Sequence, residues 1–288
     1  MPYKILEAKT LAPKNKLIVV EAPMIARHGS AGQFAILRID ETGERIPLTL
    51  ADWDRERGTV TFIFQEVGKT SVQLGTLSAG DELLDVVGPL GNPTEIEKIG
   101  TVVTVGGGLG IAPLFPISRA FYEAGNRVIS IIGARNKELI FWDDRIRNVC
   151  HDLRICTDDG SMGRKGFVSD ELGSIIYSET ENVALVFAIG PTIMMKVVAD
   201  TTRAKGIKTV ISLNPVMVDG TGMCGACRVE VDGKTFFACT DGPDFDAHKV
   251  NFELLMKRQQ AFKREEKLSL EQYHKKCRAE LKLENAGI

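Results

Sequence analysis

The sequence predicts an N-terminal antiparallel β-barrel, a doubly wound α/β domain with a parallel sheet, a short cysteine-rich loop region and a helical C-terminal tail. Short β-branched and aromatic runs, separated by turn residues, occupy the first hundred positions. From residue 100 onward, apolar strands alternate with helical segments. Three of the six cysteines lie between residues 224 and 239. At 288 residues, the chain is long enough for two compact domains.

The charge balance argues against a nucleic-acid partner. Lys and Arg total 36 and Asp and Glu total 38, for a net charge of −2, whereas phosphate backbones attract a concentrated basic face. No apolar run reaches the ~18 residues of a membrane span, and the first residues lack the apolar core of a signal peptide. We therefore expect a cytoplasmic protein that binds neither nucleic acid nor membrane.

The first domain is predicted to span residues 1–98. Turn residues such as Gly43, Gly58 and Gly80 separate its strands, and most of the intervals contain no convincing helix. Evenly spaced strands of this kind are typical of a small antiparallel barrel. The expected strands are 16–21, 33–38, 59–65 and 82–87.

The second domain is predicted to span residues 99–212. Its strands are apolar on both faces, which indicates a parallel sheet covered by helices on both sides. The expected strands are 101–105, 127–133, 153–157, 183–190 and 208–212. The expected helices are a stretch that follows Pro113 and ends at about Tyr122, and the segments 137–148 and 192–205.

The remaining chain divides into a loop region, 213–246, and a tail, 247–288. The loop region is rich in Gly, Cys and Asp and contains no long predicted element. The tail is charged and has sparse apolar residues, which predicts one or two amphipathic helices that pack on the body or on a partner.

A glycine-rich segment, Gly106-Gly-Gly-Leu-Gly-Ile-Ala-Pro113, follows a predicted strand and opens a helix. Its backbone can approach a pyrophosphate closely, and the helix start offers free N–H groups. Four glycines in five residues are costly for an ordinary turn, which favours nucleotide binding. The alternative is a tight turn without a ligand.

Two further segments, Arg45-Ile-Pro-Leu-Thr49 and Gly68-Lys-Thr-Ser71, place basic and hydroxyl side chains on the barrel. They suit the phosphates and ring of a flavin. A charged strand end and an ordinary turn explain the same residues equally well.

The cysteine region has the spacing Asp219-x4-Cys224-x2-Cys227-x11-Cys239. The C-x4-C-x2-C…C pattern is that of plant-type [2Fe–2S] ferredoxins, and here an aspartate, which is also an anionic ligand, stands in the first place. The spacing favours an iron–sulfur cluster. Structural zinc and a loop of free thiols are the alternatives. Cys150, Cys156 and Cys277 lack such spacing and are interpreted as packing thiols.

Together with Ile189-Gly-Pro-Thr-Ile-Met-Met195, these motifs resemble the ferredoxin–NADP reductase superfamily over about residues 1–245. Within it, they are most similar to two kinds of subunit: the electron-transfer subunit of dihydroorotate dehydrogenase, and the small subunit of NADH-dependent ferredoxin:NADP+ oxidoreductase, an electron-bifurcating transhydrogenase. Asp219 in place of cysteine, and Ile189 before Gly190-Pro191, resemble the transhydrogenase subunit, and the helical tail fits it better.

The resemblance implies a role for each matching residue. Leu48 and Thr49 would face the flavin ring of FAD, and Arg45 is counted with the FAD residues although its spacing to Thr49 is one residue longer than usual. The FAD pyrophosphate would be held by Gly68, Lys69, Thr70 and Ser71. The NAD(H) site would be bordered by Gly107, Gly108, Gly110, Pro113, Ala134, Arg135, Asp158, Asp159, Gly190, Pro191 and Met194. The cluster ligands would be Asp219, Cys224, Cys227 and Cys239.

The activity implied is hydride exchange between NAD(H) and FAD, followed by single-electron transfer through a [2Fe–2S] cluster to or from a partner. The cofactors carry this chemistry, so no catalytic acid or base is expected. The implied partner is a larger flavin and iron–sulfur subunit, and ferredoxin and NADP(H) would be reached through it. The alternatives are an electron-transfer subunit for dihydroorotate oxidation and a zinc-stabilised nucleotide-binding regulator.

Overall fold

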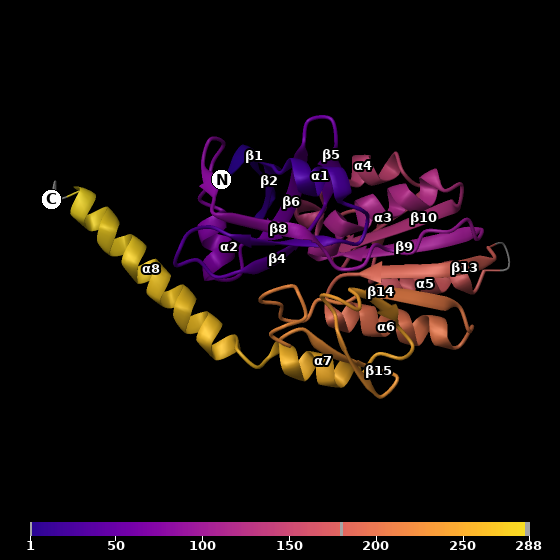
Figure 1. Cartoon of the computed structure of the whole chain (residues 1–288). Helices are drawn as coiled ribbons and strands as arrows, with labels where there is room; N and C mark the ends of the chain where they lie inside the picture. The colour runs from indigo at the N-terminus through magenta and orange to yellow at the C-terminus, as the bar shows by residue number, and fades with distance from the viewer. Residues whose placement is uncertain (1, 179–180, 286–288) are drawn as a thin grey trace.

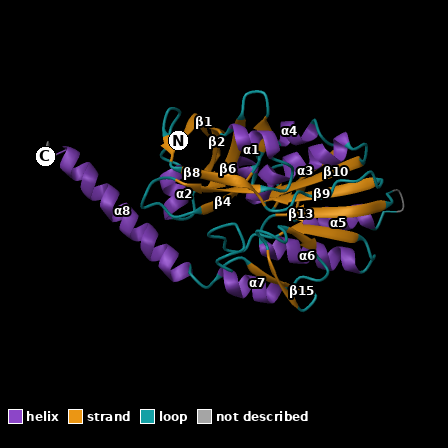
Figure 2. Ribbon diagram, viewed as in Figure 1, coloured by secondary structure: helices purple, strands orange, loops and turns teal. Residues whose placement is uncertain are grey.

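A computed structural model describes residues 2–178 and 181–285, with side chains as far as Lys276. Figure 1 shows the N-terminal strands beside the α/β domain, with the loop region and α7 (Phe252–Gln259) below the larger sheet. Figure 2 shows the same view, with the N-terminal strands beside the larger sheet and helices on both sides of that sheet. The side chain of Cys277 lies outside the described residues.

The N-terminal strands pair in antiparallel fashion, as predicted, in two sheets of order β5-β6-β2-β1-β7 and β4-β3-β8. The strands are β1 (Tyr3–Ala12), β2 (Asn15–Glu21), β3 (Phe34–Arg38), β4 (Ile46–Thr49), β5 (Asp52–Asp54), β6 (Thr59–Gln65), β7 (Glu82–Leu83) and β8 (Asp85–Leu90). Among the described residues, hydrogen bonds do not join the two sheets into one closed barrel.

A shared apolar core holds these two sheets together. Phe62 and Phe64 of β6 pack in one buried cluster with Leu37 of β3 and Val86 of β8. Two short helices that the sequence pattern did not predict, α1 (Pro23–His28) and α2 (Lys69–Leu74), contribute Ile25 and Leu74 to this core. Six residues are too few to show a helical period.

The α/β domain has a seven-stranded sheet of order β12-β11-β10-β9-β13-β14-β17. All neighbours are parallel except β14 and β17. The strands are β9 (Thr101–Gly107), β10 (Arg127–Ala134), β11 (Asp152–Thr157), β12 (Arg164–Lys165), β13 (Val183–Ile189), β14 (Lys208–Ser212) and β17 (Asp244–Asp246). The strand order reverses between β9 and β13, so a crevice is expected at their carboxyl ends.

The helices that follow these strands cover both faces of the sheet (Figure 1). They are η1 (Gly108–Gly110), α3 (Ile111–Glu123), η2 (Lys137–Leu139), α4 (Asp143–Arg147), α5 (Val168–Ile176) and α6 (Thr192–Arg203). The helix expected over 137–148 is wrong, because the chain is extended at Ile140 and left-handed at Trp142. Helix α5 was not predicted.

A second apolar cluster joins the two domains. It combines Ala51 and Ile63 of the N-terminal domain with Ile111, Ala112 and Leu114 of α3. All five are almost fully buried, and apolar burial of this kind stabilises the association of the two domains. The strand segment after Thr49 is thereby held against the first turn of α3.

The C-terminal region contains a hairpin and two helices. The hairpin is formed by β15 (Arg228–Val231) and β16 (Lys234–Phe237), and α7 is followed by α8 (Lys263–Asn285). Helix α7 packs on the body through Phe252 and Leu255, whereas Figure 1 shows the yellow α8 extending away from the α/β domain. The predicted helical tail is confirmed. No helix in the described parts of the chain has the length and apolarity to cross a membrane.

Candidate functional site

The predicted NAD(H) residues lie together at the carboxyl edge of the parallel sheet. Gly107 at the end of β9 pairs with Gly133 of β10, and Gly106 pairs with Ile189 at the end of β13. Ala134 pairs with Thr157, the residue before Asp158. The structure therefore gathers four predicted loops at the point where the strand order reverses.

Close contacts with neighbouring atoms explain why several residues at this edge of the sheet are glycines. A Cβ atom on Gly110 would lie 2.3 Å from the carbonyl oxygen of Ile189, and one on Gly107 would lie 2.3 Å from Sδ of Met194. A Cβ atom on Gly190 would lie 2.8 Å from Cε of the same Met194 side chain. In contrast, nothing lies within 4 Å of a Cβ position on Gly108, which has a φ of +56°. The turn is packed on one side and open on the other, as a cradle for a dinucleotide requires.

The rim of this edge carries exposed charges. The Asp158 backbone N–H donates to Ala134 O over 3.1 Å, and Asp159 N–H donates to Arg135 O over 3.2 Å, so the two loops run side by side. Hydrogen bonds from Ser161 hold the pKa of Asp159 below its usual range. Pro113 is buried in the first turn of α3, where a missing N–H is tolerated, and Pro191 precedes α6.

The predicted flavin residues lie on the smaller sheet and on α2. Thr49 of β4 pairs with Phe34 of β3, and both Leu48 and Thr49 are half-buried. Ser71 Oγ accepts hydrogen bonds from the N–H groups of Val67, at 2.9 Å, and Gly68, at 3.0 Å. Gly68 has no atom within 4 Å of its Cβ position, so the approach to this turn is open.

The carboxylate of Glu44 interacts with two other polar groups of this turn, those of Thr70 and Lys69. Thr70 Oγ1 donates to Glu44 Oε2 over 2.5 Å, and Lys69 Nζ lies 3.6 Å from Glu44 Oε1. Arg45 is exposed. Sequence reasoning missed Glu44, although it directly precedes the Arg45–Thr49 motif.

The four predicted cluster ligands lie as two pairs. Sγ of Cys227 and Sγ of Cys239 are 3.2 Å apart and both are buried, whereas Cys224 is exposed beside Asp219. Asp219 Oδ2 accepts the Cys224 N–H over 2.7 Å. In the described part of the chain, no three His, Cys, Asp or Glu side chains are close enough to share a single ion. Two pairs match a two-iron cluster, in which each iron takes two protein ligands.

Backbone N–H groups point at two of the cysteine sulfur atoms. Gly222 N–H donates to Cys239 Sγ over 3.1 Å, and Ala226 N–H donates to Cys224 Sγ over 3.5 Å. Burial, together with Cys227, raises the pKa of the Cys239 thiol to about 12, so a metal has to displace its proton. The donor set and the inward N–H groups fit an iron–sulfur cluster.

The cysteine loop packs directly on the smaller sheet of the N-terminal domain. A Cβ atom on Gly220, which has a φ of +75°, would lie 2.7 Å from Leu90 Cδ1 and 2.9 Å from Ile36 Cγ1. Ile36 also shares one apolar cluster with Cys227 and Cys239. Since Ile36 is on β3, next to β4 with its Thr49, the two predicted redox sites are adjacent.

The segment that connects the two domains, with Asn92 and Thr94, contacts the region that follows the last of the predicted cluster ligands. The sequence analysis did not assign it to the site. Asn92 N–H donates to Gly242 O over 2.7 Å, and its side-chain amide donates to Thr240 O over 3.0 Å. Thr94 Oγ1 donates to Asp244 Oδ2 over 2.6 Å. Burial raises the pKa of Asp244 to about 6. The turn signal Gly91-Asn92-Pro93 marked this segment, but nothing local indicates its partners.

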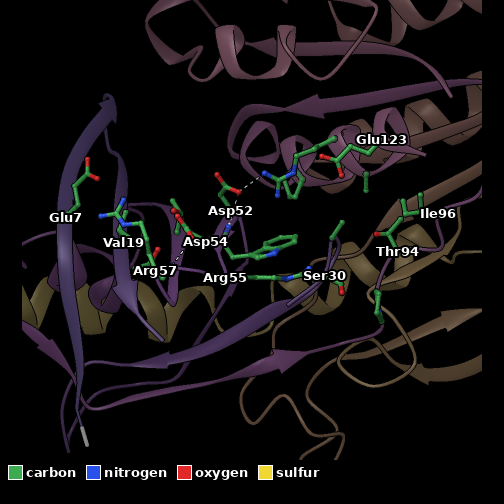
Figure 3. A pocket seen from close by; sticks show the side chains of 18 of the residues that line it. Glu7, Val19, Ser30, Asp52, Asp54, Arg55, Arg57, Thr94, Ile96 and Glu123 are labelled. Carbon is green, nitrogen blue, oxygen red and sulfur yellow. Dashed lines mark hydrogen bonds and ion pairs between the residues drawn. The ribbon is translucent and has the colours of Figure 1, made fainter. Parts of the chain in front are cut away.

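A cleft of about 1080 Å³ lies elsewhere, between the N-terminal sheet and α3 (Figure 3). It is lined by Asp52, Asp54, Arg55, Arg57 and Glu123 among others, and by none of the predicted cofactor residues. The predicted cofactor sites therefore lie outside this cleft.

Comparison with known proteins agrees with this geometry. Residues 214–251 match the family model of the iron–sulfur cluster binding domain of dihydroorotate dehydrogenase B. A Thermotoga maritima protein described as a dihydroorotate dehydrogenase B (NAD(+)) electron transfer subunit homolog is 45% identical, over 89% of this chain and 90% of its own length.

Two solved structures are also similar to this chain. One, which addresses flavin-based electron bifurcation in the NADH-dependent reduced ferredoxin–NADP oxidoreductase, is 43% identical with a TM-score of 0.89, and the match covers 94% of this chain and 97% of that one. A Neisseria gonorrhoeae ferredoxin NADP+ reductase with bound FAD and NADP shares the fold alone, at 18% identity and a TM-score of 0.58 over 72% of this chain and 91% of that one. The chain thus belongs to the family of dihydroorotate dehydrogenase B electron transfer subunits and their homologues.

Proposed function

We propose that this chain is the small subunit of an NADH-dependent ferredoxin:NADP+ oxidoreductase. It exchanges hydride between NAD(H) and FAD, and it passes single electrons through a [2Fe–2S] cluster to or from a larger flavin and iron–sulfur subunit. Ferredoxin and NADP(H) are reached through that partner. The identity and coverage of the bifurcating oxidoreductase structure support this assignment.

The contact between Gly220 and Ile36 is the observation that carries the proposal. The cluster loop lies against the strand next to β4, while the nucleotide turn lies against the segment that follows β4. One flavin bound along β4 would therefore adjoin both the nicotinamide site and the cluster. Bound FAD would supply the exchange between two-electron hydride transfer and one-electron transfer to the cluster.

The protein's own part is binding, orientation and exclusion of water. Leu48 and Thr49 would line the flavin ring, and Lys69 and Thr70 would hold its phosphates once Glu44 has moved aside. The open side of Gly108 would receive the NAD(H) pyrophosphate. The buried cluster that contains Ile111 and Ala112 keeps water away from the junction of the two domains.

At the cluster, Asp219 and Cys224 would hold one iron and Cys227 and Cys239 the other. The division follows the two pairs in the structure. The backbone N–H groups of Gly222 and Ala226 would stabilise negative charge on the sulfur atoms. We retain 1–98, 99–212, 213–246 and 247–288 as the proposed flavin, nucleotide, cluster and tail regions.

A second candidate is an electron-transfer subunit for dihydroorotate oxidation, which the match at residues 214–251 favours. The two candidates share the cofactors and differ in the partner. A complex purified from its host that oxidises dihydroorotate would support the second candidate. A complex that moves electrons between NADH and NADP, with no dihydroorotate activity, would support the first.

The decisive experiment for the redox assignment is anaerobic purification of the complex, followed by iron, sulfide, zinc and flavin analysis. We expect two irons and two sulfides in this subunit, one FAD, and bleaching of the flavin absorption by NADH. Zinc without iron, in a colourless protein, would instead identify a nucleotide-binding regulator and overturn the proposal.

A further inference from the structure

One carboxylate joins the N-terminal domain to two elements of the α/β domain. Asp52, the first residue of β5, accepts a hydrogen bond from Arg119 Nη1 over 2.9 Å and forms a second ion pair with Arg145. Arg119 belongs to α3 and Arg145 to α4. The side chains of Asp52 and Arg119 are 17% and 25% exposed, so water screens this pair weakly, and it screens the pair with the 40% exposed Arg145 more. Figure 3 shows Asp52 at the centre of the cleft, with a dashed line leaving its carboxylate.

Aromatic rings fix both guanidinium groups in place. Arg119 Cζ lies 5.2 Å from the centre of the Trp53 ring and 5.0 Å from that of Phe115. Arg145 Cζ lies 4.3 Å from the Phe115 ring and 4.2 Å from the Trp142 ring. Phe115 is thus shared by the two arginines, and cation–π attraction adds to each ion pair. The result is one ordered cluster and not two independent surface pairs.

The backbone at Trp142 is itself constrained to build this cluster. Its φ of +57° is a left-handed conformation that a bulky residue rarely adopts. Trp142 directly precedes α4 and packs edge-on against Phe115, with ring centres 5.4 Å apart. Strain of this kind persists only where the surrounding contacts compensate for it. Here it places the start of α4 so that Arg145 reaches Asp52.

The cluster connects the elements that carry both proposed cofactor sites. Asp52 follows Thr49 by three residues, on the segment proposed to face the flavin. Arg119 stands on the helix that begins directly after Gly110. Arg145 stands on the helix that follows the loop at Arg135. Arg119 and Arg145 therefore link the two elements that follow the loops of the proposed nicotinamide site to Asp52, which lies close to the strand proposed to bind the flavin.

We propose that Asp52 is a positioning residue for hydride transfer: through Arg119 and Arg145, it sets the distance and angle between the nucleotide domain and the flavin domain. This inference rests on the proposed function. The apolar contact of Ala51 with Ile111 and Ala112 holds the domains together but has little directional preference. The charged hydrogen bonds of Asp52 are directional and fix the orientation. Asp52 itself exchanges neither proton nor electron.

The test is the variant Asp52→Asn in the complete complex. It keeps the side-chain shape and removes the charge that binds two arginines. We expect the rate of flavin reduction at saturating NADH to fall about 10- to 100-fold, because small displacements of the reacting groups cost that much. We also expect a weaker long-wavelength absorbance from nicotinamide stacked on flavin, with unchanged FAD content. Asp52→Glu, which keeps the charge, should recover part of the rate.

The matched control is Asp200→Asn. Asp200 pairs with Lys196 within α6 at 2.9 Å, on the surface of one domain, so its loss should leave the rate unchanged. If Asp52→Asn does not fold, Arg145→Lys tests the same pair, with a smaller expected loss of rate and of the stacking absorbance.

A normal rate and normal stacking absorbance in Asp52→Asn would overturn the inference, even if the melting temperature falls, because that result describes a merely structural ion pair. Failure of the proposed function gives a different result, in which NADH does not reduce the flavin of the wild-type complex at all.

Discussion

Arg258 donates a hydrogen bond from Nη2 to the carbonyl oxygen of Ala226, over 3.1 Å, and so ties α7 to the cysteine loop. The next residue, Gln259, accepts a hydrogen bond from Thr192 Oγ1 over 2.9 Å and donates to Asn214 O over 3.0 Å. One turn of α7 therefore holds the cluster loop on one side and the first residue of α6 on the other. The helix links the proposed cluster site to the proposed nucleotide site.

Replacing Arg258 with methionine should loosen the cluster loop. The change keeps an apolar side chain and removes a charged hydrogen bond, which is worth about 1.5–3 kcal/mol. We expect the variant to lose iron to a chelator several times faster than the wild type. Lys257→Met, exposed on the same helix, should retain iron normally. Equal iron loss in both variants would show that the contact with Ala226 does not support the loop.

Gly110→Ala should damage the nucleotide site. The added Cβ would lie 2.3 Å from Ile189 O, which is backbone and cannot turn away. We expect a loss of about 1–3 kcal/mol in stability, as for other overpacked positions, and a rise of tenfold or more in the NADH concentration for half-maximal flavin reduction.

The control for this change is Gly173→Ala in α5, where no atom lies within 4 Å of the added Cβ. Alanine favours a helix over glycine by about 0.5–1 kcal/mol, so this variant should melt at a higher temperature. Normal NADH dependence in Gly110→Ala would contradict the proposed location of the dinucleotide.

Glu44→Gln should strengthen FAD binding. The Glu44 carboxylate engages Thr70 and Lys69, the groups proposed to bind the flavin phosphates, and it repels those phosphates. We expect the dissociation constant of FAD, from fluorescence titration of flavin-free protein, to fall several-fold. Glu41→Gln, whose carboxylate pairs with Arg38, is the control. Weaker FAD binding in Glu44→Gln would mean that Glu44 orients Lys69 and Thr70 and does not compete with FAD.

Asp219→Cys should lower the midpoint potential of the cluster. A thiolate is a softer donor and gives more electron density to iron than a carboxylate does, and clusters with fewer thiolate ligands, such as those with two His in place of two Cys, have higher potentials. A redox titration followed by electron paramagnetic resonance measures the change. Asp232→Asn, in the turn of the β15–β16 hairpin, changes charge without touching a proposed ligand. An unchanged midpoint in Asp219→Cys would argue that Asp219 is not bound to iron.

Asp244→Asn should stabilise the protein at neutral and alkaline pH. Burial raises the pKa of Asp244 to about 6, against hydrogen bonds from Thr94 and Ser212 that lower it, and no charged side chain contributes. Its unfolded pKa is about 3.9, so the folded state loses stability as pH rises from about 4 to above 6. The loss is at most about 3 kcal/mol.

Urea unfolding at pH 4.5 and pH 8 measures this effect. The gain in Asp244→Asn should be large at pH 8 and small at pH 4.5. Asp246→Asn, exposed on the same strand, should show no such gain. A gain independent of pH would indicate a packing effect instead of a titrating carboxyl.

The sequence by itself determined the features that depend on near neighbours in the chain. The strand-turn-helix at residues 101–122, the spacing of Asp219 and the three cysteines, and the helical tail all lie within local windows. Apolar period, glycine content and ligand spacing are legible there because they report local backbone requirements. The family resemblance rests on the same short segments, and a relative of 45% identity bears it out.

Only the tertiary structure decided which of these segments meet. Asp52 finds Arg119 across 67 positions and Arg145 across 93, and Asn92 finds Thr240 across 148. Helix α4 is short because the chain is extended at Ile140 and left-handed at Trp142, which interrupts the helix expected over 137–148. Pairings of this range depend on how sheets and helices pack, and a single sequence carries no local signal for them.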